Sequence, residues 1–112
     1  MADAADLRRL ALALPGTTEA PHFDRVAFKV KRIFATLATD ATTANLKFTP
    51  DEQLLKCTTA PDAFAPIANA WGRQGWTTVT LAQISKPDLQ AALETAWRHA
   101  VPAPPKKPRL SR

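Results

Sequence analysis

Residues 25–38 read RVAFKVKRIFATLA, and this stretch decides the fold. Val26, Phe28 and Val30 alternate with smaller or charged residues, which is the two-residue period of a half-buried β-strand. A second apolar run follows after only two basic residues, so the stretch predicts an antiparallel β-hairpin. It holds four basic residues and no acidic one, which predicts a positive edge.

The register of this hairpin follows if Lys31 and Arg32 are the two turn residues. The expected pairs are then Val30 with Ile33, Phe28 with Ala35 and Val26 with Leu37. One face of the hairpin is continuously apolar, and the other carries Ala27, Lys29, Phe34 and Thr36. The turn lacks the Asn-Gly or Asp-Gly that two-residue hairpin turns prefer, so a longer turn or a bulge that shifts the register is the alternative.

Length and charge indicate one domain with a basic tail. Residues 1–101 form the expected domain, and the proline-rich residues 102–112 are expected to be disordered. The net charge of +5 lies mostly in that tail, because it holds four of the fifteen basic residues and leaves eleven against ten acidic residues in the body. A nearly neutral body is not typical of a strong nucleic-acid binder.

Cellular location is inferred from features that the sequence lacks. Cys57 is the single cysteine, so no internal disulfide can form, which fits a reducing compartment. The first residues do not combine a basic region with an apolar run, and no apolar stretch approaches the roughly 18 residues of a membrane span. We therefore expect a soluble cytoplasmic protein.

Helices are predicted on both sides of the hairpin. Apolar spacing predicts a helix over 3–14, a short helix over 50–57 behind the cap Thr49-Pro50-Asp51-Glu52, and a last helix that Ser85 caps and Pro102 ends. Residues 44–49 and 76–81 read as strands, and residues 17–24 as a loop. Residues 62–69 stay open between a helical turn and an irregular strand, and residues 71–76 read as a glycine-punctuated turn.

This element order predicts an α+β fold. An antiparallel sheet packed on one face by the N- and C-terminal helices accounts for it, with the other face partly open. The expected open face carries Lys29, Phe34, Thr36, Lys47, Trp76, Thr78 and Thr80, with Lys31, Arg32 and Arg73 at its rim.

Catalytic and cofactor motifs are absent from the sequence. There is no nucleophile elbow, phosphate loop, dinucleotide fingerprint or metal motif, so we expect no enzyme, no cofactor and no metal. Asp51 and Glu52 read as a helix start, Cys57 as a small packed residue, and His99 as a favourable charge at a helix C-terminus.

Binding chemistry is what remains. Lysine and arginine pair with phosphates without reading sequence, and aromatic rings on a sheet face stack on bases. The candidate nucleic-acid-binding residues are Lys29, Lys31, Arg32, Lys47, Arg73 and Trp76. In the competing interpretation, the lysines only protect a sheet edge from aggregation, and Trp71 and Trp76 fill the core.

Several segments in order resemble the MmcQ/YjbR family of small bacterial proteins. They are Leu14-Pro15-Gly16-Thr17-Thr18-Glu19, Ala27-Phe28-Lys29-Val30, Ile33-Phe34-Ala35-Thr36-Leu37, Asn45-Leu46-Lys47-Phe48 and Gly75-Trp76-Thr77-Thr78-Val79. The resemblance implies a compact α+β fold similar to that of bacterial frataxins and a DNA-binding role for paired hairpins, without enzymatic residues. The chain departs from the family at the wing tip, where Lys31-Arg32 replace glycine, and it lacks the acidic ridge by which frataxins bind iron.

The sequence is therefore compatible with three candidate functions. The first is a monomeric, non-enzymatic module that binds DNA without sequence specificity and does not bind membranes. The alternative is a module that binds a protein or peptide on the open sheet face or along an edge strand. The third is a small-molecule or catalytic site around His22, which needs Glu19 and a basic residue in the same concave pocket.

Overall fold

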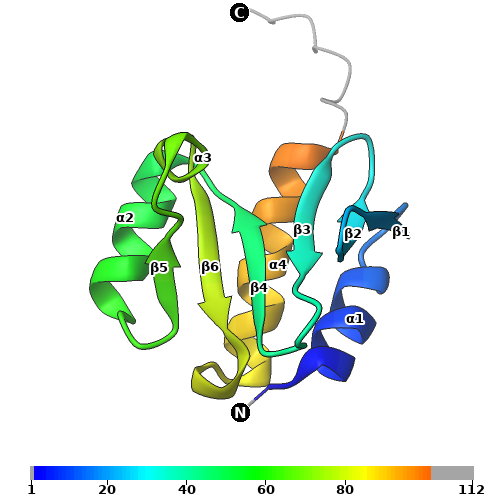
Figure 1. Cartoon of the computed structure of the whole chain (residues 1–112), viewed down its shortest axis with the longest axis horizontal. Helices are drawn as coiled ribbons and strands as arrows, with labels where there is room; N and C mark the ends of the chain where they lie inside the picture. Colours follow the sequence, from blue (N-terminus) through cyan, green and yellow to red (C-terminus); the bar gives the residue numbers. More distant parts are fainter. Residues whose placement is uncertain (1, 102–112) are drawn as a thin grey trace, which may run out of the picture.

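Six β-strands form one antiparallel sheet, and two helices cover one of its faces (Figure 1). The strand order is β1-β2-β3-β4-β6-β5. The computed structural model describes residues 2–101, so the prediction of a disordered tail over 102–112 lies outside the described residues. The strands are β1 (Thr18–His22), β2 (Arg25–Lys29), β3 (Ile33–Leu37), β4 (Thr43–Lys47), β5 (Phe64–Pro66) and β6 (Trp76–Thr80).

The predicted helices begin where their caps place them. Helices α1 (Ala4–Leu12), α2 (Pro50–Thr59) and α4 (Lys86–Ala100) are capped by Asp3, Thr49 and Ser85, each of which accepts a hydrogen bond from a backbone N–H of the first turn. The sequence did not predict α3 (Ala70–Arg73) or the short 3-10 helix over Leu81–Gln83.

The core lies between the sheet and helices α1 and α4, which confirms the predicted α+β class. Fully buried side chains reach it from strands and from both helices, namely Leu7, Phe28, Ala35, Ala44, Leu46, Val79, Leu89 and Leu93. Figure 1 shows α4 running behind the middle of the sheet, with α1 beside it. The opposite face of the sheet is covered by no helix of the described chain.

The predicted hairpin register is right until a β-bulge changes it. Val26 pairs with Leu37 and Phe28 with Ala35, but Lys29 pairs with Ile33, because the register shifts between Phe28 and Lys29. The bulge leaves Phe34 without a partner on β2. Phe34 is fully buried, so its predicted place on the open face was wrong, and Ile33 occupies that face instead.

The predicted loop over 17–24 contains strand β1, which sequence reasoning missed. Pro21 and three polar residues leave β1 without an apolar alternation, and proline is tolerated because β1 is an edge strand. The tight turn to β2 places Phe23 at a φ of 59°, and its ring is 94% exposed. The segment left open over 62–69 contains β5 at the other edge.

Helix α2 is tied to the C-terminal end of α4 by one side-chain pair. His99 Nε2 lies 2.9 Å from Glu52 Oε1. Partial burial acts to raise the pKa of Glu52, but hydrogen bonds from the Thr49 N–H and from His99 outweigh it, so the pKa lies below its ordinary value. The ionised carboxylate therefore stabilises the folded chain.

We expect Gly75→Ala to destabilise the fold by at least about 2 kcal/mol, because a Cβ there would lie 1.8 Å from Phe48 O at a φ of +109°. The matched control is Gly16→Ala, where φ is +76° but the nearest atom is Val30 Cγ1 at 3.6 Å. That variant should lose only about 1 kcal/mol. Urea denaturation measures both, and equal losses would contradict the backbone clash.

The Glu52 carboxylate should make stability depend on acidity. Because its folded pKa is depressed, its contribution is present above the unfolded pKa and is lost as pH falls through the folded pKa. Glu52→Gln should thus be less stable than the wild type near pH 7, and the difference should disappear as pH falls below the folded pKa of Glu52. Chemical denaturation across this range measures the difference, with Glu94→Gln, which removes the exposed ion pair to Arg98, as control. A constant difference would contradict the mechanism.

Candidate nucleic-acid interface

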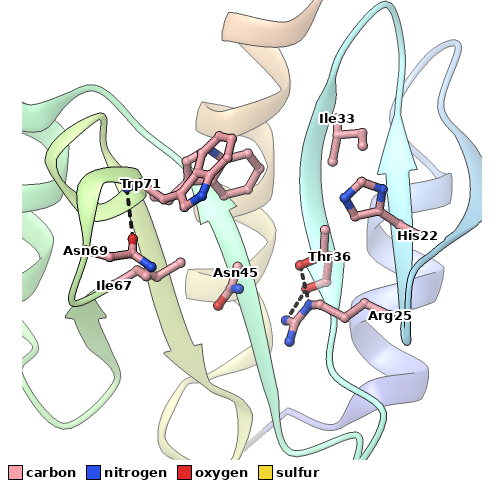
Figure 2. Close-up of a pocket in the computed structure, with 9 residues that line it drawn as sticks. His22, Arg25, Ile33, Thr36, Asn45, Ile67, Asn69 and Trp71 are labelled. Carbon is pink, nitrogen blue, oxygen red and sulfur yellow. Dashed lines mark hydrogen bonds between the residues drawn. The ribbon is translucent and has the colours of Figure 1, made fainter.

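A groove crosses the open face of the sheet (Figure 2). Cross-strand partners lie on the same face, so the register Ala27–Thr36–Asn45–Thr78 marks a row across this face. The groove has a volume of about 400 Å³, which lies in the range of small-ligand sites. Its lining residues are His22, Arg25, Ile33, Thr36, Asn45, Ile67, Asn69, Trp71 and Trp76.

One wall of the groove comes from the β1–β2 hairpin, which contributes His22 and Arg25. Arg25 Nε donates to Thr36 Oγ1 at 2.8 Å, and its Nη2 donates to the Thr36 carbonyl at 3.4 Å. These bonds hold the guanidinium against the floor, as Figure 2 shows. Sequence reasoning did not select Arg25, although its alternation with Val26 already placed it on the open face.

The facing wall is aromatic. Trp71 is 58% exposed, which contradicts the interpretation that its indole fills the core. Its backbone N–H donates to Asn69 Oδ1 at 2.8 Å, which caps α3 and fixes the loop. Gln53 Nε2 donates to the carbonyls of Gly72 and Trp76 at 2.9 and 3.0 Å, so α2 anchors both tryptophan segments.

The floor offers hydrogen-bonding groups between these walls. Asn45 Oδ1 accepts a hydrogen bond from Thr78 Oγ1 at 2.9 Å, which leaves the amide nitrogen of Asn45 as the donor toward the groove. The groove thus combines apolar and aromatic side chains with a few fixed polar groups, the usual composition of a ligand site.

The predicted cations lie together at one end of the sheet. Lys29 ends β2, Lys31 and Arg32 lie in the turn before β3, Lys47 ends β4, and Arg73 lies three residues before β6. Because neighbouring strands run antiparallel, the ends of β2 and β4 lie beside the starts of β3 and β6, at the end of the sheet that is uppermost in Figure 1. The shared register also places Lys29 and Lys47 on one face, because their partners Ile33 and Trp76 line the same groove.

These five cations take part in no ion pair within the described part of the chain. The cations of α1 and α4 differ, because Arg8 pairs with Glu19, Arg9 and Lys86 with Asp6, and Arg98 with Glu94. None of the five lines the groove itself, and Trp76 is the only predicted site residue that does. The cations therefore form a basic end beside the groove.

The predicted constellation around His22 is not assembled. His22 lines the groove, but Glu19 does not. Glu19 is the cross-strand partner of the buried Phe28, so it faces the helical side of the sheet. Its carboxylate accepts from Arg8 Nε at 2.7 Å. The interpretation of His22, Glu19 and a basic residue as one pocket was wrong.

Residues 2–101 hold neither a candidate metal site nor a helix fit to cross a membrane. No group of three or more His, Cys, Asp or Glu side chains there is arranged to hold a metal ion. None of the helices in that range has the length and apolar character that crossing a bilayer requires.

The chain is similar to a known protein family and to a solved structure. The sequence model of the YjbR family matches residues 12–99. No curated protein sequence matches the chain. The chain is similar to the crystal structure of DR2400 from Deinococcus radiodurans, described with a DUF419 domain, with a TM-score of 0.72 and 25% identity over 86% of this chain and 76% of that one. Because the family match covers most of the chain and the fold agrees, the protein belongs to the YjbR family.

Proposed function

We propose that the protein is a non-enzymatic module that binds single-stranded DNA without reading its sequence. The observation that carries the proposal is the groove with two partly exposed tryptophans, which opens beside a basic end whose cations have no carboxylate partners among residues 2–101. Bases would stack on Trp71 and Trp76, and phosphates would meet the five cations.

The groove favours a single strand over a duplex. Bases in a duplex are stacked on one another, so an indole inside a groove cannot reach their faces, whereas an unpaired base can enter. Stacking on an aromatic side chain contributes about 1–3 kcal/mol per base and tolerates every base. The open face also offers hydrogen bonds from Arg25 and Asn45, but these groups are few.

The alternative is a peptide in the same groove. Ile33, Ile67 and both tryptophans would receive apolar side chains, and no carboxylate lines the groove. This function predicts affinity that hardly changes with salt, because the groove contributes one guanidinium that already bonds to Thr36. Salt dependence therefore distinguishes the two functions.

Electrostatic binding should give a steep salt dependence. If all five cations meet phosphates, the slope of log K against log salt should be near −3.5 for single-stranded DNA, since each contact contributes about −0.7. The double variant Lys31→Ala, Arg32→Ala should reduce the slope by about 1.4. The control Arg8→Ala, Arg9→Ala removes two cations that are already paired on α1. Fluorescence anisotropy measures these values, and absence of binding at low salt would contradict the proposal.

Stacking predicts a specific loss when Trp71 is truncated. Trp71→Ala should weaken binding of an oligothymidine by at least about fivefold, because stacking contributes about 1–3 kcal/mol per base. Leu54→Ala, which removes an apolar side chain that is 68% exposed on α2, should leave the affinity unchanged. The same pair of variants is compared on duplex DNA. Equal affinity of Trp71→Ala and the wild type for the single strand would contradict base stacking in the groove.

A further inference from the structure

A second cavity lies behind the basic end of the sheet. It also has a volume of about 400 Å³, and it reaches from the start of β3 and the end of β4 to the last turns of α4. Ile33 and Trp76 line both this cavity and the open-face groove, so the two are neighbours. The lining residues are Arg32, Ile33, Phe34, Lys47, Phe48, Thr49, Trp76, Ala96, His99 and Ala100.

The cavity contains two of the cations that the groove lacks. Lys47 is half-buried, and its Nζ donates to the Phe48 carbonyl at 3.3 Å, while no carboxylate pairs with it among residues 2–101. Arg32 lines the same cavity from the β2–β3 turn and is likewise unpaired in that range. A partly buried ammonium and a guanidinium without counter-ions favour an anion, and phosphate is the anion that both side chains suit best.

The negative charges near this cavity are already engaged. Glu52 in the first turn of α2 bonds to the Thr49 N–H at 2.9 Å and to His99, and neither Glu52 nor Asp51 lines the cavity. His99 also lines the cavity, and its Nε2 is the atom that bonds to Glu52. The balance of charge inside the cavity is therefore positive.

The far side of the cavity is closed by packed residues. Ala96 and Ala100 of α4 and the rings of Phe34 and Phe48 form this wall, and all four residues are buried. A polynucleotide chain cannot continue through such a wall, so the cavity suits the end of a chain better than its middle. Lys47 is also the direct cross-strand partner of Trp76, which places the cation next to the indole expected to stack on a base.

We propose that the two cavities form one site for a nucleotide with a terminal phosphate. The base lies in the open-face groove against Trp76, and the phosphate lies in the second cavity between Lys47 and Arg32. This inference rests on the proposed binding of single-stranded DNA, and it adds that the chain recognises a phosphorylated end. The same chemistry is present in a free nucleoside monophosphate.

The test measures binding of labelled oligothymidines that carry a 5′-phosphate, a 3′-phosphate or only hydroxyl ends. One phosphorylated end should bind at least about tenfold more tightly than the hydroxyl-ended strand, as expected for a charge-assisted contact. Lys47→Gln should abolish this preference, which is the ratio of the two affinities measured on the same variant, although the loss of one of the five cations should also weaken binding of both strands. Arg32→Gln, at an exposed turn, is the second variant and should reduce the preference. Lys29→Gln, outside both cavities, should preserve it.

Three outcomes separate this inference from the function on which it rests. Equal binding of phosphorylated and hydroxyl-ended strands would overturn the end site while DNA binding stands. A preference that persists in both Lys47→Gln and Arg32→Gln would also overturn it. Binding of thymidine monophosphate, lost in Lys47→Gln, without binding of any strand would support the site and contradict the proposed DNA binding.

Discussion

Burial of the Phe34 ring shapes the end of the sheet at which both cavities lie. A β-bulge between Phe28 and Lys29 turns this ring into the core, where it is fully buried. Strand β3 then pairs with β4 only over Ala35–Leu37, so its first residues separate from the end of β4. Both cavities lie at this separation, and Ile33, moved to the open face by the bulge, lines each of them.

Charge is arranged differently on the helical side of the sheet and at its basic end. Cations on α1 and α4 pair with carboxylates of these two helices or of β1, so their charges are balanced locally. The cations at the strand ends have no such partners within the described residues, although the body as a whole is almost neutral. A weak, salt-sensitive attraction at one end of the sheet is what this arrangement can supply, while shape and stacking come from the groove.

The sequence predicted much of the fold because its signals are local. Helix caps such as Thr49 with Glu52 involve residues three apart. Alternation along β6 placed Trp76 and Thr78 on one face of the sheet and Thr77 and Val79 on the other. The candidate site was predicted only in part. Trp76 and the basic end were found, but Arg25 and Trp71 were missed as groove residues, since their roles depend on β1 and α3, which lack a clear periodic signal.

Local sequence patterns were enough for the α+β class, the three capped helices, the family, and the buried faces of the predicted strands apart from the start of β3. The bulge, the burial of Phe34 and the meeting of Trp71 and Trp76 with Asn45 in one groove emerge only when the chain is packed in three dimensions. The physical reason is that alternation fixes which side a residue faces within one strand, whereas a bulge is decided by the volume available in the core. That volume is set by helices distant in sequence, above all by α4, which closes the site from behind.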